Sequence, residues 1–205
     1  MNTVKRIIRE RWYAFAAWLL ITVLLASWLF PWLTRISPEE KLTVFVGSYS
    51  RDTGELRQVL ERNKPEELVE LNVYSGALDD GLYDAFYTTY GLSYADVMVV
   101  PRQAVEEIVS SENGNLSDFF TVIPQGFFPN ADWTYYSAGG EHYGIRIYDS
   151  QTGKGFCSLI DFTKDGKENQ DYYIFFNKDS VHLGGMREGG ATDAAVAIAE
   201  LLMSI

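Results

Sequence analysis

Small polar residues follow the first buried strand that we expect in this sequence, and their chemistry suits ligand binding. Hydroxyl and backbone N–H groups in the segment 47–50, directly after the apolar run 42–46, can hold a carboxylate or a phosphate. Polar residues also follow the second and third expected strands. A plain turn with a helix cap is the commoner role of such residues, and both interpretations stay open. The candidate ligand-binding residues are Gly47, Ser48, Tyr49, Ser50, Tyr74, Ser75 and Arg102.

Acidic and imidazole side chains are the next groups with useful chemistry, as metal ligands. Asp79, Asp80 and Asp84 lie close together, but the alternating oxygen ligands of a calcium-binding loop are missing. A solvated acidic turn is the better interpretation. The two histidines, His142 and His182, each flank a strand and have no partners at the spacing of a zinc site. We therefore predict no metal site and no cofactor.

Motifs for nucleophilic catalysis and phosphate binding are equally weak. Cys157 lies in an apolar run, where a small buried hydrophobic side chain is a better interpretation than a nucleophile. The segment 184–190 contains Arg187 but lacks the Gly-Lys-Ser/Thr ending of a phosphate-binding loop, which favours a mobile linker before a C-terminal helix. G-x-S-x-G, H-E-x-x-H and G-x-G-x-x-G motifs are absent from the sequence. No catalytic residue is predicted, and the chain is not expected to be an enzyme.

The charge of the chain is divided between two segments of very different composition. Residues 1–37 hold five of the 17 basic and one of the 28 acidic residues, which leaves a net charge of −15 on residues 38–205. A body this acidic lacks the cationic surface that nucleic-acid binding needs. The sequence thus indicates a short basic, apolar leader followed by an acidic globular body.

Residues 12–33 form an uncharged, apolar run of 22 residues that predicts a transmembrane helix. At a rise of about 1.5 Å per residue the run spans about 33 Å, enough for a hydrocarbon core of about 30 Å. A cleaved signal peptide is the alternative, but its apolar core is shorter and ends at a small-residue cleavage site. Basic residues are concentrated before the run, so residues 1–11 are expected in the cytoplasm. Residues 34–40 are then a linker, and residues 41–205 a domain outside the cell membrane.

The body alternates strands and helices in the pattern of an α/β domain. This order predicts a parallel sheet with right-handed crossovers, followed by an antiparallel or mixed part. Thr192 is expected to cap the last helix. The aromatic residues between 119 and 136 either form an exposed docking surface or fill the core of a loop-rich flap. Strands are predicted at 42–46, 68–74, 95–100, 142–148, 156–162 and 172–177, and helices at 53–63, 82–90, 103–110 and 193–203.

Four segments of the body follow one another in an informative order: the apolar strand and polar loop at 42–49, the strand with Asp at its start at 94–100, the segment His142–Ile147 with Arg146, and the strand with an Asn-Lys-x-Ser turn at 172–181. Their order resembles the type 2 extracytoplasmic (periplasmic) solute-binding proteins, the receptors of ABC importers. Such receptors hold their ligand between two lobes, and the stretch between Val100 and Asp171 is too short for a second lobe. The resemblance therefore implies a single lobe with a parallel or mixed sheet flanked by helices, preceded by one transmembrane helix. Within this resemblance, 42–49 is similar to the family's first strand and ligand-side loop, and 142–147 to the crossing between lobes, where Arg146 stands in place of the usual Pro. The segment 172–181 is similar to the family's return strand and its turn.

The resemblance implies a membrane-anchored domain that acts in protein interaction or assembly at a membrane complex, or as a reduced solute receptor. Interaction ranks slightly higher, because a missing lobe removes the enclosing cleft. The expected partners are the bilayer, through residues 12–33, a membrane protein such as a transporter permease, and a small solute; no nucleic acid is expected. The alternative is an extracytoplasmic enzyme of unknown reaction.

Overall fold

The computed structural model divides the chain into two compact units, Met1–Ser37 and Pro38–Ile205. The second unit therefore begins at Pro38, three residues before the predicted domain. The residues that the structure describes are 2–33, 35–50, 52–111, 114–128, 130, 132–164 and 170–205.

The first unit is one long helix, α1 (Asn2–Leu33), which includes the whole predicted apolar helix. Its segment Trp12–Phe30 is long and apolar enough to cross a membrane. The hydroxyl of Thr22 donates a hydrogen bond to the carbonyl oxygen of Trp18 at 2.9 Å. This polar group is therefore satisfied inside the helix, as an apolar solvent requires.

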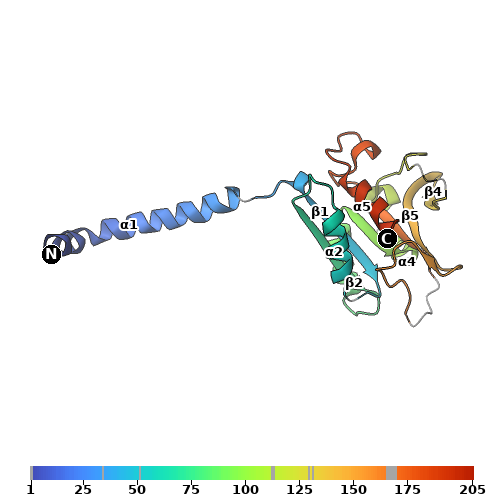
Figure 1. The fold of residues 1–205 in the computed structure, drawn as a ribbon, viewed down its shortest axis with the longest axis horizontal. Helices are drawn as coiled ribbons and strands as arrows, with labels where there is room; N and C mark the ends of the chain where they lie inside the picture. Colours follow the sequence, from blue (N-terminus) through green and yellow to red (C-terminus); the bar gives the residue numbers. More distant parts are fainter. Residues whose placement is uncertain are drawn as a thin grey trace. The chain divides into compact units, whose positions relative to one another are not determined.

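Seven strands of the described body residues form one mixed sheet, which confirms the predicted α/β fold (Figure 1). The strand order is β2-β1-β3-β7-β5-β4, and β6 pairs with β5 outside this path. The strands are β1 (Lys41–Ser48), β2 (Glu70–Ala77), β3 (Val97–Pro101), β4 (Tyr135–Ala138), β5 (Glu141–Asp149), β6 (Lys154–Gly155) and β7 (Tyr172–Phe176).

The parallel half of the sheet consists of β1, β2 and β3, with β1 in the middle. Every residue of β1 from Leu42 to Ser48 is buried, because helices cover both faces of these strands. This explains why the strand reads as a continuous apolar run rather than an alternating one. The predicted parallel arrangement is confirmed here.

Two hydrophobic cores lie on opposite faces of the sheet. One face packs against α2 (Gly54–Asn63) and α5 (Ala194–Leu202), which also contact each other. The other face packs against α3 (Tyr83–Phe86), the π-helical turn that continues it at Tyr87–Leu92, and α4 (Arg102–Ser111). Adjacent residues of β3 and β7 supply alternate faces, as the strand period of two requires.

The antiparallel half forms around β7, which pairs antiparallel with both β3 and β5. Strand β4 forms a hairpin with β5 and closes this edge. The aromatic residues between 119 and 136 contribute to the two cores: Phe120 is buried in one core and Phe128 in the other, and Trp133 packs against Phe128 from a partly exposed position. These rings therefore fill the core rather than form an exposed docking surface.

The strand predicted at 156–162 is wrong. Only Lys154–Gly155 pairs with β5, and the following residues form turns and coil. Some of their apolar side chains still fill the core without a strand ladder: Cys157, Ile160 and Phe162 are buried, and Phe162 stacks on Tyr148 at 5.0 Å, whereas Phe156 is exposed. Apolar content therefore predicted burial for part of this segment, but not its backbone partners: the N–H of Ser158 donates to the carbonyl oxygen of Ile205, near the other end of the body, at 3.3 Å.

The loop before α5 also differs from its prediction. The N-cap residue of α5 is Asp193, and the hydroxyl of Thr192 instead lies 2.7 Å from Nδ1 of His182. The glycine-rich segment contains a 3-10 helix, Gly184–Met186, whose last side chain is buried. Thr192 therefore fixes this loop to the body rather than capping the helix.

Candidate functional site

The serine hydroxyls after β1 bind neighbouring protein groups. Ser48 and Ser50 are both buried, and Oγ of Ser48 accepts the N–H of Ser50 at 3.1 Å. Oγ of Ser50 accepts the N–H of Asp161 at 2.7 Å, and the N–H of Tyr49 donates to the carbonyl oxygen of Asp161 at 3.0 Å. The predicted anion-binding loop is thus engaged by the coil that follows β6.

The other candidate residues besides Gly47 lie in the neighbouring strand β2 and in α4. Tyr74 and Ser75 are inside β2, which extends three residues further than predicted, and the Tyr74 ring stacks on Tyr90 at 4.7 Å. Arg102 is exposed, pairs with Glu106 at 2.7 Å and lies 6.0 Å from the centre of the Tyr136 ring. Two of the candidates line pockets at the carboxyl ends of the strands: Ser75 lines one beyond β2 with Asp79 and Asp80, and Tyr49 lines a separate cavity beyond β1 and β3.

This cavity has a volume of about 200 Å³ and lies beyond the carboxyl ends of β1 and β3. Tyr49 follows β1, and Pro101 ends β3. Ligands of open α/β sheets bind at this edge. The polar residues that line the cavity are Tyr49, Tyr83, Asp84, Gln103, Glu107 and Gln170.

Two buried polar atoms of this lining have no hydrogen-bond partner among the described residues: the hydroxyl oxygen of Tyr83 and Oε1 of Gln170. The side chain of Tyr83 is only 9% exposed, and its hydroxyl packs directly over Gly47. A Cβ atom at position 47 would lie 2.6 Å from that oxygen, so glycine is needed for close approach rather than for a turn. A buried polar atom without a partner costs about 1–3 kcal/mol, so these two atoms are the groups of the lining that would gain most from a hydrogen-bond partner.

The electrostatics keep the Tyr83 hydroxyl protonated and surround it with negative charge. Burial is the largest cause that raises the pKa of Tyr83, and the carboxylates of Asp84 and Glu107 add to the rise. Asp84 and Glu107 line the cavity and are exposed, whereas Tyr83 lines it and is buried. The neutral phenol can therefore donate or accept a hydrogen bond at any physiological pH.

Replacing Tyr83 by phenylalanine is expected to stabilise the ligand-free body by about 1 kcal/mol, because the change removes a buried hydroxyl that has no partner. Urea denaturation of the full chain in detergent, followed by near-ultraviolet circular dichroism, measures this change. Tyr87→Phe is the matched comparison, since the Tyr87 hydroxyl is also buried without a partner among the described residues. A clear loss of stability in Tyr83→Phe would contradict the assignment of an unpaired hydroxyl.

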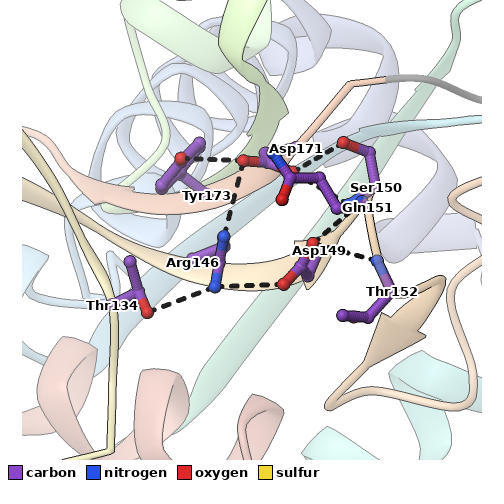
Figure 2. Close-up of polar contacts among 8 residues, drawn as sticks. All are labelled: Thr134, Arg146, Asp149, Ser150, Gln151, Thr152, Asp171 and Tyr173. Carbon is purple, nitrogen blue, oxygen red and sulfur yellow. Dashed lines mark hydrogen bonds and ion pairs between the residues drawn. The ribbon is translucent and has the colours of Figure 1, made fainter.

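A second polar cluster surrounds Arg146 on β5 (Figure 2). The guanidinium pairs with Oδ2 of Asp149 at 3.1 Å and with Oδ2 of Asp171 at 3.7 Å, and Nη2 donates to the hydroxyl of Thr134 at 3.3 Å. Asp171 also accepts both the N–H and the hydroxyl of Ser150, each at 2.8 Å. Each of these groups is therefore bound by another protein group.

This cluster joins β5, β7 and the turn after β5. Oδ1 of Asp149 accepts the N–H groups of Gln151 and Thr152 at 2.9 and 3.2 Å, which shapes the turn. The hydroxyl of Tyr173 donates to Asp171 at 3.3 Å, and burial, with the Asp171 charge, raises the pKa of Tyr173 to about 12. These contacts are structural, and the carboxylates of Asp149 and Asp171 neutralise the charge of Arg146.

The remaining chemical candidates are held in structural contacts. Cys157 is buried, and burial raises the pKa of its thiol, which disfavours the nucleophilic thiolate. His142 lies 2.7 Å from the hydroxyl of Ser137, and His182 is fully buried. Within the described part of the chain, no group of three or more His, Cys, Asp or Glu side chains is placed to hold a metal ion.

The cavity residues that sequence reasoning missed come from helices and a loop rather than from strand ends. Gln103 and Glu107 are four residues apart on the first turns of α4, so they share one face of the helix. Their spacing, directly after the third apolar strand, is a signal that could have found them. Gln170 and Tyr83 have no such signal. No protein-family model matches this sequence, and no curated protein matches it significantly.

Proposed function

We propose that this chain is a membrane-anchored extracytoplasmic receptor domain, similar to one lobe of a type 2 solute-binding protein, that binds a small solute. The observation that carries the proposal is the cavity at the carboxyl edge of the sheet, because two residues of its lining, Tyr83 and Gln170, each have a buried polar atom without a partner among the described residues. Unpaired buried groups are rare in native proteins, and a ligand that pairs them recovers their desolvation cost.

The topology supports the single-lobe part of the proposal. The segment similar to the family's return strand is β7, which runs antiparallel between β3 and β5 in the middle of the sheet. The described residues between Val100 and Asp171 supply α4 and three strands of the same sheet. These residues therefore complete the single sheet of the body.

The sequence around α1 supports the membrane anchor and its direction. Four basic residues, at positions 5, 6, 9 and 11, precede the apolar segment, and Arg35 follows it. Such asymmetry favours a cytoplasmic N-terminus and an extracytoplasmic body. A transporter permease is the partner that the resemblance to importer receptors implies.

Protein interaction at a membrane complex is the second candidate function. It is favoured by the exposed position of Asp84 and Glu107 in the lining of the cavity, which leaves this edge open to a partner surface. A receptor with two lobes encloses its ligand, whereas a single lobe offers one open face. The two candidates differ in whether a small solute alone stabilises the chain.

Thermal unfolding of the full chain in detergent, with a panel of amino acids, sugars, oligopeptides and metal ions, tests the receptor proposal. A solute at about 100 times its Kd should stabilise the native state by about 2.7 kcal/mol and raise the midpoint. Gln103→Trp, which places a large ring in the cavity, should remove the shift. Gln58→Trp on α2 is the control, because Gln58 is exposed and does not line the cavity. A flat panel, together with a stable complex with a membrane protein, would instead support the interaction function.

A further inference from the structure

The charge of the cavity selects a class of ligand. Asp84 and Glu107 contribute two carboxylates, and none of the described residues that line the cavity is basic. The two buried atoms without partners, the Tyr83 oxygen and Oε1 of Gln170, can both accept hydrogen bonds. From this set we infer that the cavity binds a small ligand that carries a protonated primary amine. The inference rests on the proposed receptor function and gives it a ligand chemistry.

An ammonium group fits these acceptors because it has three donors and no acceptor. Gln103 donates to Oε1 of Glu107 at 2.6 Å, so the amide holds this carboxylate in place and leaves its second oxygen for a ligand. Oε1 of Gln170 is an acceptor only. A ligand N–H bonded to it would satisfy a buried group that has no partner among the described residues.

An anionic ligand is disfavoured at the same site. Its charge would be repelled by both carboxylates that line the cavity, Asp84 and Glu107. The whole body also carries an excess of negative charge, so any cation is attracted weakly to its surface. A specific site must therefore be separated from this general attraction by variants inside the cavity.

The size and apolar lining of the cavity restrict the rest of the ligand. A volume of about 200 Å³ is below the range of about 300–1,000 Å³ that drug-sized ligands occupy. Leu78, Pro101 and Ala104 line the cavity beside the polar groups and offer contacts to a short alkyl chain. A short alkylamine or diamine matches both properties, whereas an oligopeptide or oligosaccharide is too large.

The test uses three four-carbon compounds that differ only in their end groups: 1,4-diaminobutane, 1,4-butanediol and succinate. Binding to the full chain in detergent is measured by isothermal titration and by the thermal unfolding midpoint. The diamine should bind and raise the midpoint, while the diol and succinate should do neither. Added NaCl should weaken diamine binding, because exposed carboxylates are screened by salt.

Cavity variants should weaken the binding of the diamine in a graded way. Asp84→Asn and Glu107→Gln should each raise the Kd about threefold to fivefold, as exposed charge pairs do, and the double variant about tenfold or more. Glu67→Gln is the charge control, since Glu67 is exposed and does not line the cavity. Tyr83→Phe should raise the Kd while Tyr87→Phe should leave it unchanged, because only Tyr83 lines the cavity.

Each of the other outcomes contradicts the amine ligand, the receptor function or both. Diamine binding that persists in the double carboxylate variant would be general attraction to an acidic surface and would overturn the inference. Binding of the diol or succinate that Tyr83→Phe weakens would overturn the ligand class but leave the receptor proposal standing. If neither these compounds nor the wider panel of solutes binds, both the inference and the receptor proposal fail.

Discussion

Replacing Phe175 by alanine is expected to lower the free energy of unfolding of the body by about 3–5 kcal/mol. Phe175 lies in β7, is fully buried, and its ring centre is 4.7 Å from that of Phe120 and 5.5 Å from that of Tyr136. Its loss leaves a cavity that rings held by neighbouring strands cannot refill. Urea denaturation of the full chain in detergent, followed by near-ultraviolet circular dichroism, gives the change.

The packing around Phe175 explains why little relaxation is expected. Gly144 on β5 faces it in the antiparallel register, and a Cβ atom there would lie 2.8 Å from the Phe175 ring. The Phe175 ring thus occupies the space that a side chain at position 144 would need. Phe156→Ala is the control, since Phe156 is 46% exposed and should cost less than about 0.5 kcal/mol. A loss below about 1 kcal/mol for Phe175→Ala would mean that this face of the sheet is not a tightly packed core.

The parallel half of the fold could be predicted from the sequence because its strands are buried on both faces. A strand such as β1 then consists of a continuous apolar run, and the helix between two such runs makes a parallel neighbour the natural connection. The antiparallel position of β7 between β3 and β5 has no local signal. This position depends on which edge strand of the parallel half is still unpaired when β7 joins the sheet.

The candidate site was harder to predict because its groups meet through long-range contacts. Ser50 offers a hydroxyl at the expected place, but Asp161, more than a hundred residues away in sequence, donates to it. Tyr83 belongs to a short helix, and it reaches the carboxyl edge only because Gly47 has no side chain. The sequence therefore locates the carboxyl edge of the sheet, whereas the atoms that line the cavity there depend on packing.

Removal of the carboxylate of Asp96 is the other change with a large expected effect. Oδ2 of Asp96 accepts the N–H of Thr43 on β1 at 2.8 Å, and Oδ1 accepts the hydroxyl of Ser180 at 2.6 Å. The Ser180 oxygen in turn accepts the N–H of His182 at 3.1 Å. Asp96→Ala leaves two donors without acceptors and should lower the free energy of unfolding by about 2–4 kcal/mol.

The network continues through His182 to the first residues of the body. Nε2 of His182 lies 2.9 Å from the carbonyl oxygen of Lys41 and 3.1 Å from that of Pro38, so this nitrogen carries the proton and donates. Asp96→Ala should therefore also loosen the segment at Pro38–Lys41. Faster amide hydrogen exchange there than in wild type would report this loosening.

The effect of Asp96→Ala should depend on pH in a direction that burial sets. Burial is the largest cause that raises the pKa of Asp96, so the folded state binds a proton more readily than the unfolded state, whose aspartates titrate near about 3.9. The stability that this group contributes is complete below that value and is lost as the pH rises through the folded pKa. The difference in stability between wild type and Asp96→Ala should therefore grow as the pH falls from 7 towards about 4.

Urea denaturation of both chains at several pH values measures that difference. Asp179→Ala, in the same turn as Ser180 but exposed, should change stability by less than about 0.5 kcal/mol at every pH. If the stability difference between wild type and Asp96→Ala shrinks as the pH falls, the pKa of Asp96 in the folded state is lowered rather than raised. The hydrogen bonds from Thr43 and Ser180 to the charged carboxylate would then outweigh its burial, and Asp96 would stabilise the fold as an anion.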